Sequence, residues 1–367
     1  MKLRRMTALS AAIPLMLSFA SCGSRSSSSG SVTEQTYAVT TSGEAETTEA
    51  SSAEPATEKA EPAAESTTEE ASTEAGTIRF SDLISDREPT PALWKTSDPS
   101  TGNTLYMMGT VHMADPKLLT FPEYILDVYE SCEGIAVEYD TEQLMADASA
   151  MQSFVADMMY LDGTTIADHI SAETYEKART FLSDNGMYSS YYDMLMPGFW
   201  VDLVGVSSLL KIEGITSSGV ETYFTEKCAE DGKAVVSIEE LEAQKNALIG
   251  YSDALADYEL SCAVDEAEDT AAMAESFAAL YDCWASGDID ALAEYSVEEV
   301  PAELEADYAD YQELILYSRN RKMAEKAAEY LAEGKNYFFM AGSLHFAGEE
   351  GVDDLLAGMG YTVERIH

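Results

Sequence analysis

The stretch at residues 105–114, LYMMGTVHMA, returns later in the chain at residues 338–347 as FFMAGSLHFA. Each copy runs through apolar residues to a glycine, a hydroxyl residue, an aliphatic residue, a histidine, an apolar residue and an alanine. The chain has only four histidines, and two of them, His112 and His345, stand at the same place in the two copies. If the copies lie side by side in the fold, one site receives both imidazoles.

Short runs of strand-favouring residues precede both histidines. Residues 104–108 form one such run, which Gly109 stops, and residues 337–340 form the other. Each histidine is therefore expected at or just past the end of a buried strand. Three further strands are predicted at residues 134–140, 233–239 and 361–366.

Helical patterns fill most of the remaining sequence. Residues 123–132 are apolar at helical spacing, and this strand, helix, strand order predicts that strands 104–108 and 134–140 pair in parallel through a right-handed crossover. Residues 141–309 are mostly helical in pattern, and residues 78–94 are expected to form a loop with one short helix at most. Further helices are predicted at 314–331 and 352–357, with other helix starts at Ser171, Ser252 and Asp288.

These patterns together predict the fold class. It is α/β (mixed α+β), with a central sheet, two similar strand-GxxH units that form one site, and a large helical insertion between them.

The charge balance excludes some classes of partner. The chain carries 67 acidic and 21 basic residues, a net charge of −46, so nucleic acid and a bare anionic membrane surface are both poor partners. A solvated acidic surface explains this charge, and the cations that gather near such a surface are no evidence for a metal site.

The first residues resemble an export signal. Three basic residues precede a short apolar stretch at 6–19, and FASC at residues 19–22 resembles a bacterial lipobox. We expect residues 1–21 to be a lipoprotein signal peptide and Cys22 to be lipidated, which would anchor an extracytoplasmic protein to the cell membrane. The alternative is an ordinary cleaved signal peptide and a secreted product.

Composition separates a linker from a folded domain. Residues 22–76 are almost all Ser, Thr, Glu, Ala, Pro and Gly, which predicts a disordered acidic linker. Residues 77–367 form one domain that is large enough to bury a core. This domain has no CxxC motif, and the sequence leaves the pairing of its cysteines open: Cys132, Cys228, Cys262 and Cys283.

Four predicted strands end in a polar side chain: His112, Glu138, Glu239 and His345. In open α/β sheets, ligands collect at the carboxyl ends of the strands. His112, His345 and Glu138 would together make an open divalent metal site, in which the ion lowers the pKa of bound water and polarises a carbonyl. Without a metal, the same groups still serve as a base and an orienting acid for attack by water.

Other polar residues have more than one interpretation. Asp140, two positions after Glu138, is a secondary candidate for the site. Glu239 either joins the site or opens the helix that follows. Arg319 binds a substrate carboxylate, neutralises Glu138, or is an exposed charge on a helix. His169 lies among capping residues and is expected to be structural.

An ordered set of motifs resembles the TraB/PrgY/GumN family, relatives of the Tiki proteases. The motifs are GTVH at 109–112, EYD at 138–140, SIE at 237–239 with Gln244, RN at 319–320, and GSLH at 342–345, followed by GxxGVxxLL from 348 and GYxV from 360. The resemblance spans nearly all of residues 77–367. It implies an α/β fold related to erythromycin esterase and to the haem-binding ChaN-type proteins, with two GxxH motifs and a Glu in one site.

The resemblance also implies roles for residues. Tiki relatives are metal-dependent peptidases that use manganese or cobalt. His112, Glu138 and His345 match the site residues of the family, and Arg319 matches an arginine that accompanies them.

The sequence departs from the family pattern at two points. Ser237 and the isoleucine after it replace the usual Gly-Leu before Glu239. Glu221 stands where Asp is common after Gly219. Neither departure changes the identity of the two histidines or of Glu138.

The leading hypothesis is a surface-tethered, metal-dependent hydrolase, in particular a peptidase with a peptide or protein substrate. His112, Glu138 and His345 would hold manganese, cobalt or zinc, or position water, and Arg319 would steady the substrate or an oxyanion. One alternative is a non-catalytic protein that sequesters a peptide pheromone or haem. Another is a metal-independent, esterase-like hydrolase.

Overall fold

The computed structural model of this chain describes residues 77–296 and 299–367. The predicted signal peptide (1–21), the lipidated Cys22 and the predicted linker (22–76) lie outside the described residues. The description of the fold therefore concerns the predicted domain.

The described residues contain one six-stranded mixed sheet with the order β4-β3-β5-β2-β1-β6. The strands β4, β3, β5 and β2 run parallel to one another, whereas β1 is antiparallel to both of its neighbours. The bounds are β1 Leu93–Ser97, β2 Thr104–Thr110, β3 Gly134–Val137, β4 Ala234–Ser237, β5 Tyr337–Gly342 and β6 Thr362–Arg365. The sheet confirms the predicted α/β class.

The two sequence copies lie side by side, as predicted. Strands β2 and β5 pair in parallel, with Tyr106 opposite Phe338 and Thr110 opposite Gly342. The register is one residue out of step with the sequence match, which aligns Leu105 with Phe338. The two GxxH segments consequently leave the sheet next to each other.

The predicted direct pairing of β2 with β3 is wrong, because β5 lies between them. The four central residues of β5 are all buried, so the strand is apolar enough on both faces for a position inside the sheet. A helical crossover can connect two parallel strands that are separated by a third strand as readily as it connects two adjacent strands.

The prediction of a loop at residues 78–94 is also incomplete, because it missed β1. That strand has the sequence LWKTS, in which polar residues fill the second half, and it is defined by its antiparallel ladders to β2 and β6. The one short helix expected in this region is a 3₁₀ turn at Phe80–Asp82.

Helices account for most of the segment between β3 and β5, as predicted. Ser171 and Ser252 cap the N-termini of two of them, because each hydroxyl accepts a hydrogen bond from a backbone N–H of the first turn. The helices are α2 Glu123–Ser131, α3 Thr141–Ala146, α4 Ala148–Asp157, α5 Ala172–Asp184, α6 Pro197–Leu209, α7 Val220–Asp231, α8 Leu241–Ile249, α9 Asp253–Glu268, α10 Thr270–Ala285, α11 Ile289–Ser296, α12 Glu305–Gln312, α13 Ser318–Glu333 and α14 Val352–Gly358.

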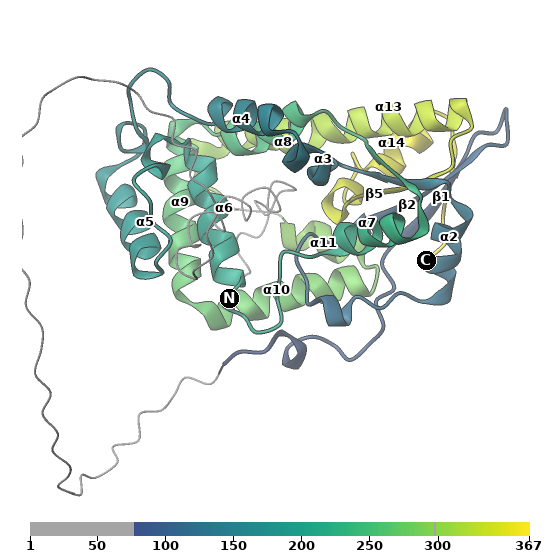
Figure 1. Cartoon of the computed structure of the whole chain (residues 1–367), viewed down its shortest axis with the longest axis horizontal. Coiled ribbons are helices and arrows are strands. Elements are labelled where there is room, and N and C mark those ends of the chain that lie inside the picture. Colours follow the sequence, from purple (N-terminus) through teal and green to yellow (C-terminus); the bar gives the residue numbers. More distant parts are fainter. Residues whose placement is uncertain (1–76, 297–298) are drawn as a thin grey trace, which may run out of the picture. The chain divides into compact units, whose positions relative to one another are not determined.

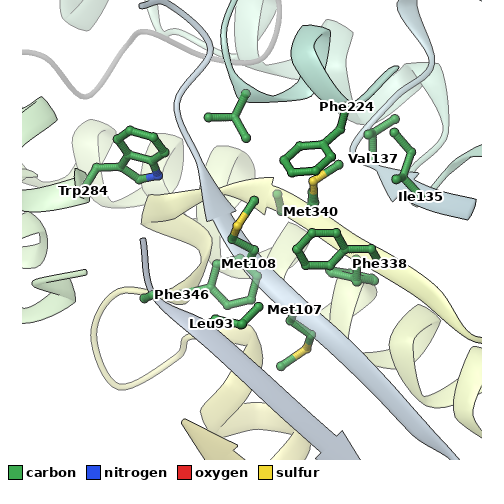
Figure 2. Close-up of a cluster of buried hydrophobic side chains, with 14 of the residues drawn as sticks. Leu93, Met107, Met108, Ile135, Val137, Phe224, Trp284, Phe338, Met340 and Phe346 are labelled. Atoms are coloured by element: carbon green, nitrogen blue, oxygen red, sulfur yellow. The ribbon is translucent and has the colours of Figure 1, made fainter. Parts of the chain in front are cut away.

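The sheet lies between two layers of helices (Figure 1). Helices α13 and α14 cover one face, and α2 and α7 cover the other. Phe224 of α7 meets Phe338 of β5 edge to face, with ring centroids 5.6 Å apart, and Figure 2 shows this contact within the buried cluster around the sheet. Burial of each such side chain contributes roughly 1.5–3 kcal/mol.

A second cluster of buried side chains lies in the helical insertion, around Trp200 of α6 and Leu260 of α9.

Among the residues described, no helix combines the length and the apolar character that a membrane crossing requires. The four cysteines of the described part are free thiols, of which Cys132 and Cys228 are buried.

Candidate active site

The four parallel strands all end at the same edge of the sheet, and the predicted polar residues meet there. The Nε2 atom of His112 lies 3.9 Å from Oε1 of Glu138, and the Nε2 atom of His345 lies 3.7 Å from the same oxygen. Both imidazoles thus face one carboxylate oxygen. Because α2 follows β2 on one face and α14 follows β5 on the other, the chain leaves these neighbouring strands in opposite directions, which is where open α/β sheets form ligand crevices.

The glycine of each GxxH motif allows the other copy to approach. A Cβ atom on Gly109 would lie 2.8 Å from the Oγ atom of Ser343, and one on Gly342 would lie 3.3 Å from Nε2 of His112. The hydroxyl of Ser343 also donates a hydrogen bond of 2.8 Å to the carbonyl of Thr110. The glycines of the repeated motif therefore allow the two copies to pack closely, and the histidines of the motif supply two imidazoles to the same place.

Glu138 is almost fully buried, with 4% of its surface exposed, and several groups hold its carboxylate. Arg319 donates to Oε2 at 2.6 Å, Gln244 donates to the same oxygen at 3.4 Å, and the backbone N–H of Gly342 donates to Oε1 at 2.7 Å. Burial alone raises the pKa of Glu138, but Arg319 and the two imidazoles outweigh it and hold the pKa well below its usual range. The carboxylate is therefore ionised at neutral pH.

Asn320 orients the ring of His345. The amide nitrogen of Asn320 donates to the carbonyl of Glu350 at 2.7 Å, so its oxygen faces His345 and accepts from Nδ1 at 2.6 Å. The remaining ring nitrogen, Nε2, then presents a lone pair to Glu138. Burial and the nearby Arg319 charge lower the pKa of His345 to about 3, which keeps the ring neutral.

Glu221 contacts the ring of His112 in the corresponding way, but with a charge. Its Oε1 atom lies 3.0 Å from Nδ1 of His112. Burial by itself lowers the pKa of His112, but the carboxylates of Glu221 and Glu138 outweigh this effect and raise the pKa to about 9. The site as it stands therefore holds an extra proton on His112 at neutral pH.

Arg319 and Glu239 form the floor of the site. Arg319 is 4% exposed and lies between Glu138 and Glu239, with Nη2 at 2.6 Å from an oxygen of each. Its Nη1 atom donates to the carbonyl of Ile315 at 3.1 Å. The arginine thus neutralises Glu138, which is one of the three interpretations offered by the sequence, and it is not an exposed helix charge.

The two secondary carboxylates differ in their surroundings. Glu239 faces Arg319 and Gln244, and burial raises its pKa above the ordinary value despite the arginine. The predicted strand at 134–140 stops at Val137, and Asp140 caps α3 by accepting from the backbone N–H of Gln143. Asp140 is therefore beside the sheet edge, but its side chain is not one of the groups that hold Glu138.

A cavity of about 80 Å³ opens beside His112 and Glu138, which is space enough for water. Its walls come from the segment after β3 and from the first turns of α7. They are lined by Tyr139, Asp140, Thr141, Glu142, Glu221, Thr222, Thr225 and Gln244, together with two valines. His345 is not one of the lining residues, and its side chain is more buried than that of His112.

Sequence reasoning gave no role to three residues that contact the site. Gln244 and Asn320 stand within the quoted family motifs, and Glu221 was noted only as a departure from the family pattern. Their contacts depend on how α7, α8 and α13 pack against the sheet, which no local sequence pattern specifies.

The donor set fits a divalent cation in its chemistry. With their Nδ1 atoms engaged, His112 and His345 each turn Nε2 toward Oε1 of Glu138, at 3.9 and 3.7 Å. Two ligand atoms of a tetrahedral zinc ion are roughly 3.4 Å apart. Glu138, Glu221 and Glu239 bring three carboxyl groups to this set, and Arg319 brings one guanidinium. The groups stand wider apart than in a formed site, since no cluster of three His, Cys, Asp or Glu ligands is found in residues 77–296 and 299–367.

The sheet and its strand-end site define an open α/β protein with a mixed acid and imidazole centre. Residues 92–365 match the model of the TraB/PrgY/gumN family, and the chain belongs to this family. The family predicted from the motifs is thereby confirmed.

Two curated relatives are proteases by name. The chain is 20% identical over 338 residues to "Metalloprotease TIKI2" of Danio rerio, a match that covers 80% of this chain and 64% of the relative. It is 21% identical over 304 residues to "Metalloprotease TIKI1" of Danio rerio, which covers 71% of this chain and 60% of the relative. The chain thus spans less than two thirds of the length of these relatives. No solved structure matches the chain.

Proposed function

We propose that this protein is a divalent-metal-dependent hydrolase of extracytoplasmic location that cleaves peptides or proteins. The observation that carries the proposal is the convergence of two Nε2 atoms, one from each copy of the repeat, on one oxygen of a buried carboxylate. Membership of the family and the similarity to two proteins named metalloproteases support the choice of reaction.

His112, His345 and Glu138 would hold the ion, with manganese, cobalt or zinc as candidates. The ion would supply a water of lowered pKa and polarise a carbonyl of the substrate. The other residues act on these three. Arg319, Gln244 and the N–H of Gly342 hold the carboxylate of Glu138 in one orientation. Because Arg319 is occupied by two carboxylates, it stabilises the charge of Glu138 rather than reaching for substrate.

We further propose that residues 1–21 direct export, that Cys22 carries the lipid and that residues 22–76 join this anchor to the catalytic domain at 77–367. These proposals rest on the sequence alone. Labelling of the cells with a radioactive fatty acid tests the lipid anchor. The unaltered protein is expected to carry the label, and the Cys22→Ser variant is expected to lack the label and to appear in the medium.

Incubation of the purified protein with a broad peptide library tests the catalytic proposal. Mass spectrometry is expected to find cleaved peptides when Mn²⁺, Co²⁺ or Zn²⁺ is supplied, and none after chelation or in the His345→Ala variant. Peptide binding without turnover that is insensitive to a chelator would favour a sequestering protein instead. A Soret band on titration with haem would favour a haem-binding protein, and hydrolysis that persists in chelator would favour an esterase-like enzyme.

A further inference from the structure

The contact between Glu221 and His112 joins α7 to the first copy of the repeat. Glu221 lies in the first turn of α7, and its Oε1 atom is 3.0 Å from Nδ1 of His112. The hydroxyl of Thr110, at the end of β2, donates a hydrogen bond to the same oxygen. One carboxylate oxygen therefore meets both the last residue of β2 and the histidine two positions beyond it.

The backbone holds this carboxylate in place. The N–H of Val220 donates to the carbonyl of Val111 at 2.9 Å. A Cβ atom on Gly219 would lie 2.1 Å from that carbonyl oxygen and 2.4 Å from the carbonyl carbon of His112, so only a glycine allows this approach. The start of α7 and the His112 segment are thus in direct backbone contact, and Glu221 has little freedom to leave the ring.

The contact decides which nitrogen of His112 faces the rest of the site. Since a carboxylate accepts hydrogen bonds, Nδ1 beside Glu221 carries a proton whether the ring is neutral or charged, and Nε2 is the nitrogen turned toward Oε1 of Glu138. Asn320 performs the same task for His345 through its amide oxygen. A partner on the second nitrogen fixes the orientation of metal-binding histidines and raises their basicity.

We propose that Glu221 is a positioning residue for His112, which it holds so that Nε2, and not Nδ1, is the ring nitrogen offered to a divalent cation beside Glu138. The cation belongs to the proposed function, whereas the hold on the ring is a property of the chain itself. In this role Glu221 acts through His112.

Cobalt binding by the chelated protein, followed through the visible absorption of Co²⁺, tests the proposal. Glu221→Gln and Glu221→Ala are expected to weaken Co²⁺ binding by about 10- to 100-fold, the range seen when the partner of a metal-binding histidine is removed. Glu221→Asp keeps the charge and should recover part of the affinity. Glu142→Gln is the matched control, because Glu142 lines the same cavity without contacting an imidazole. It removes an equal charge and should change the affinity less than twofold.

A second readout needs no metal. Nuclear magnetic resonance of protein labelled with ¹⁵N-histidine follows the titration of the four imidazoles, and the signal of His112 is assigned by its absence in His112→Gln. Glu221→Gln is expected to lower the titration midpoint of His112 by one pH unit or more, whereas Glu142→Gln leaves it in place. Thermal unfolding of each variant shows whether the fold is retained.

The outcomes separate the two proposals. A shifted midpoint in Glu221→Gln, with no Co²⁺ binding by any form of the protein, would keep the hold of Glu221 on His112 and remove the metal-dependent function. Equal Co²⁺ affinities and equal midpoints in Glu221→Gln and the unaltered protein would overturn the role of Glu221, whatever the protein hydrolyses.

Discussion

The two copies of the GxxH repeat end in histidines with the same partner on one ring nitrogen and, on the other, a charged partner in one copy and a neutral partner in the other. Both Nε2 atoms face Oε1 of Glu138, at 3.9 Å for His112 and 3.7 Å for His345. At Nδ1, His112 meets the carboxylate of Glu221, whereas His345 meets the neutral amide oxygen of Asn320. The charge of Arg319 lowers the pKa of both rings and is outweighed only at His112.

This difference follows from what packs against each copy. Helix α7 brings a carboxylate to the first copy, which borders the cavity, and α13 brings an arginine and an amide to the second, which lies further inside. A duplicated motif thus supplies two like imidazoles, and the helices around it decide the charge of each.

Alanine substitutions at the two histidines are expected to have the largest effect. If both copies serve one site, His112→Ala and His345→Ala should each lower peptide hydrolysis on the order of 10³-fold, within the range for loss of one catalytic group. His169→Ala is the control, because the ring of His169 stacks on Tyr160 and contacts Asp253 rather than Glu138. A variant at either copy that retains full activity would show that only one copy is used.

Loss of Arg319 should have the largest effect on stability. Arg319→Met leaves Glu138 and Glu239 without their buried counter-charge, and we expect a loss of roughly 3–5 kcal/mol in the free energy of unfolding. Arg321→Met on the same helix is the matched control, because Arg321 is 43% exposed and its ion pairs should contribute less than about 1 kcal/mol. Urea unfolding measures both. Similar losses in the two variants would contradict the buried ion cluster.

The two histidines should affect the pH dependence of stability in opposite directions. The pKa of His345 is lowered to about 3 from 6.5, so its contribution to stability is present above pH 6.5 and is lost as the pH falls toward 3. The pKa of His112 is raised from 6.5 to about 9, so its contribution is present below pH 6.5 and is lost as the pH rises through 9.

Unfolding in chelator at several pH values measures these slopes. Each histidine contributes at most about 1.4 kcal/mol per pH unit within its own window. His345→Gln should flatten the acid side only, and His112→Gln the alkaline side only. If both variants flatten the same side, the two environments do not differ in the way described.

Substitutions of Asp140 are expected to have the smallest effects on stability and activity. They distinguish a helix-capping role of this residue from a catalytic one. Asp140→Ala removes the cap of α3 and should cost about 1 kcal/mol of stability, whereas Asp140→Asn keeps a capping side chain and should cost little. Hydrolysis by Asp140→Asn should remain within a few-fold of the unaltered protein. A loss as large as that of the histidine variants would place Asp140 with the catalytic groups.

Much of the fold and the core of the site followed from local patterns in the sequence. The apolar runs before Gly109 and Gly342 predicted β2 and β5, and the repeat predicted that they lie side by side. The position of β5 between β2 and β3 was not predictable, because the strand order depends on how well each strand is covered on both faces. β1 was missed because its polar second half has no strand pattern by itself.

The residues that surround the site were harder to predict than the two histidines and Glu138 at its centre. His112, Glu138 and His345 were predictable because each is a polar residue directly after a predicted buried strand. Glu221 and Asn320 are polar residues on helices, and nothing in the local sequence distinguishes them from other such residues. Only the packing of α7 and α13 against the sheet edge brings them to the rings. The interpretation of Arg319 likewise depended on its burial between two carboxylates.

Peptide hydrolysis by the chelated protein, measured as Co²⁺ is added in fractions of an equivalent, tests the central claim most directly. We predict that activity is absent at first, rises in proportion to added Co²⁺ and stops rising at one ion per chain, because both copies and Glu138 form a single site. Activity that is present before any ion is added, or none at all with Co²⁺, Mn²⁺ or Zn²⁺, would contradict the claim.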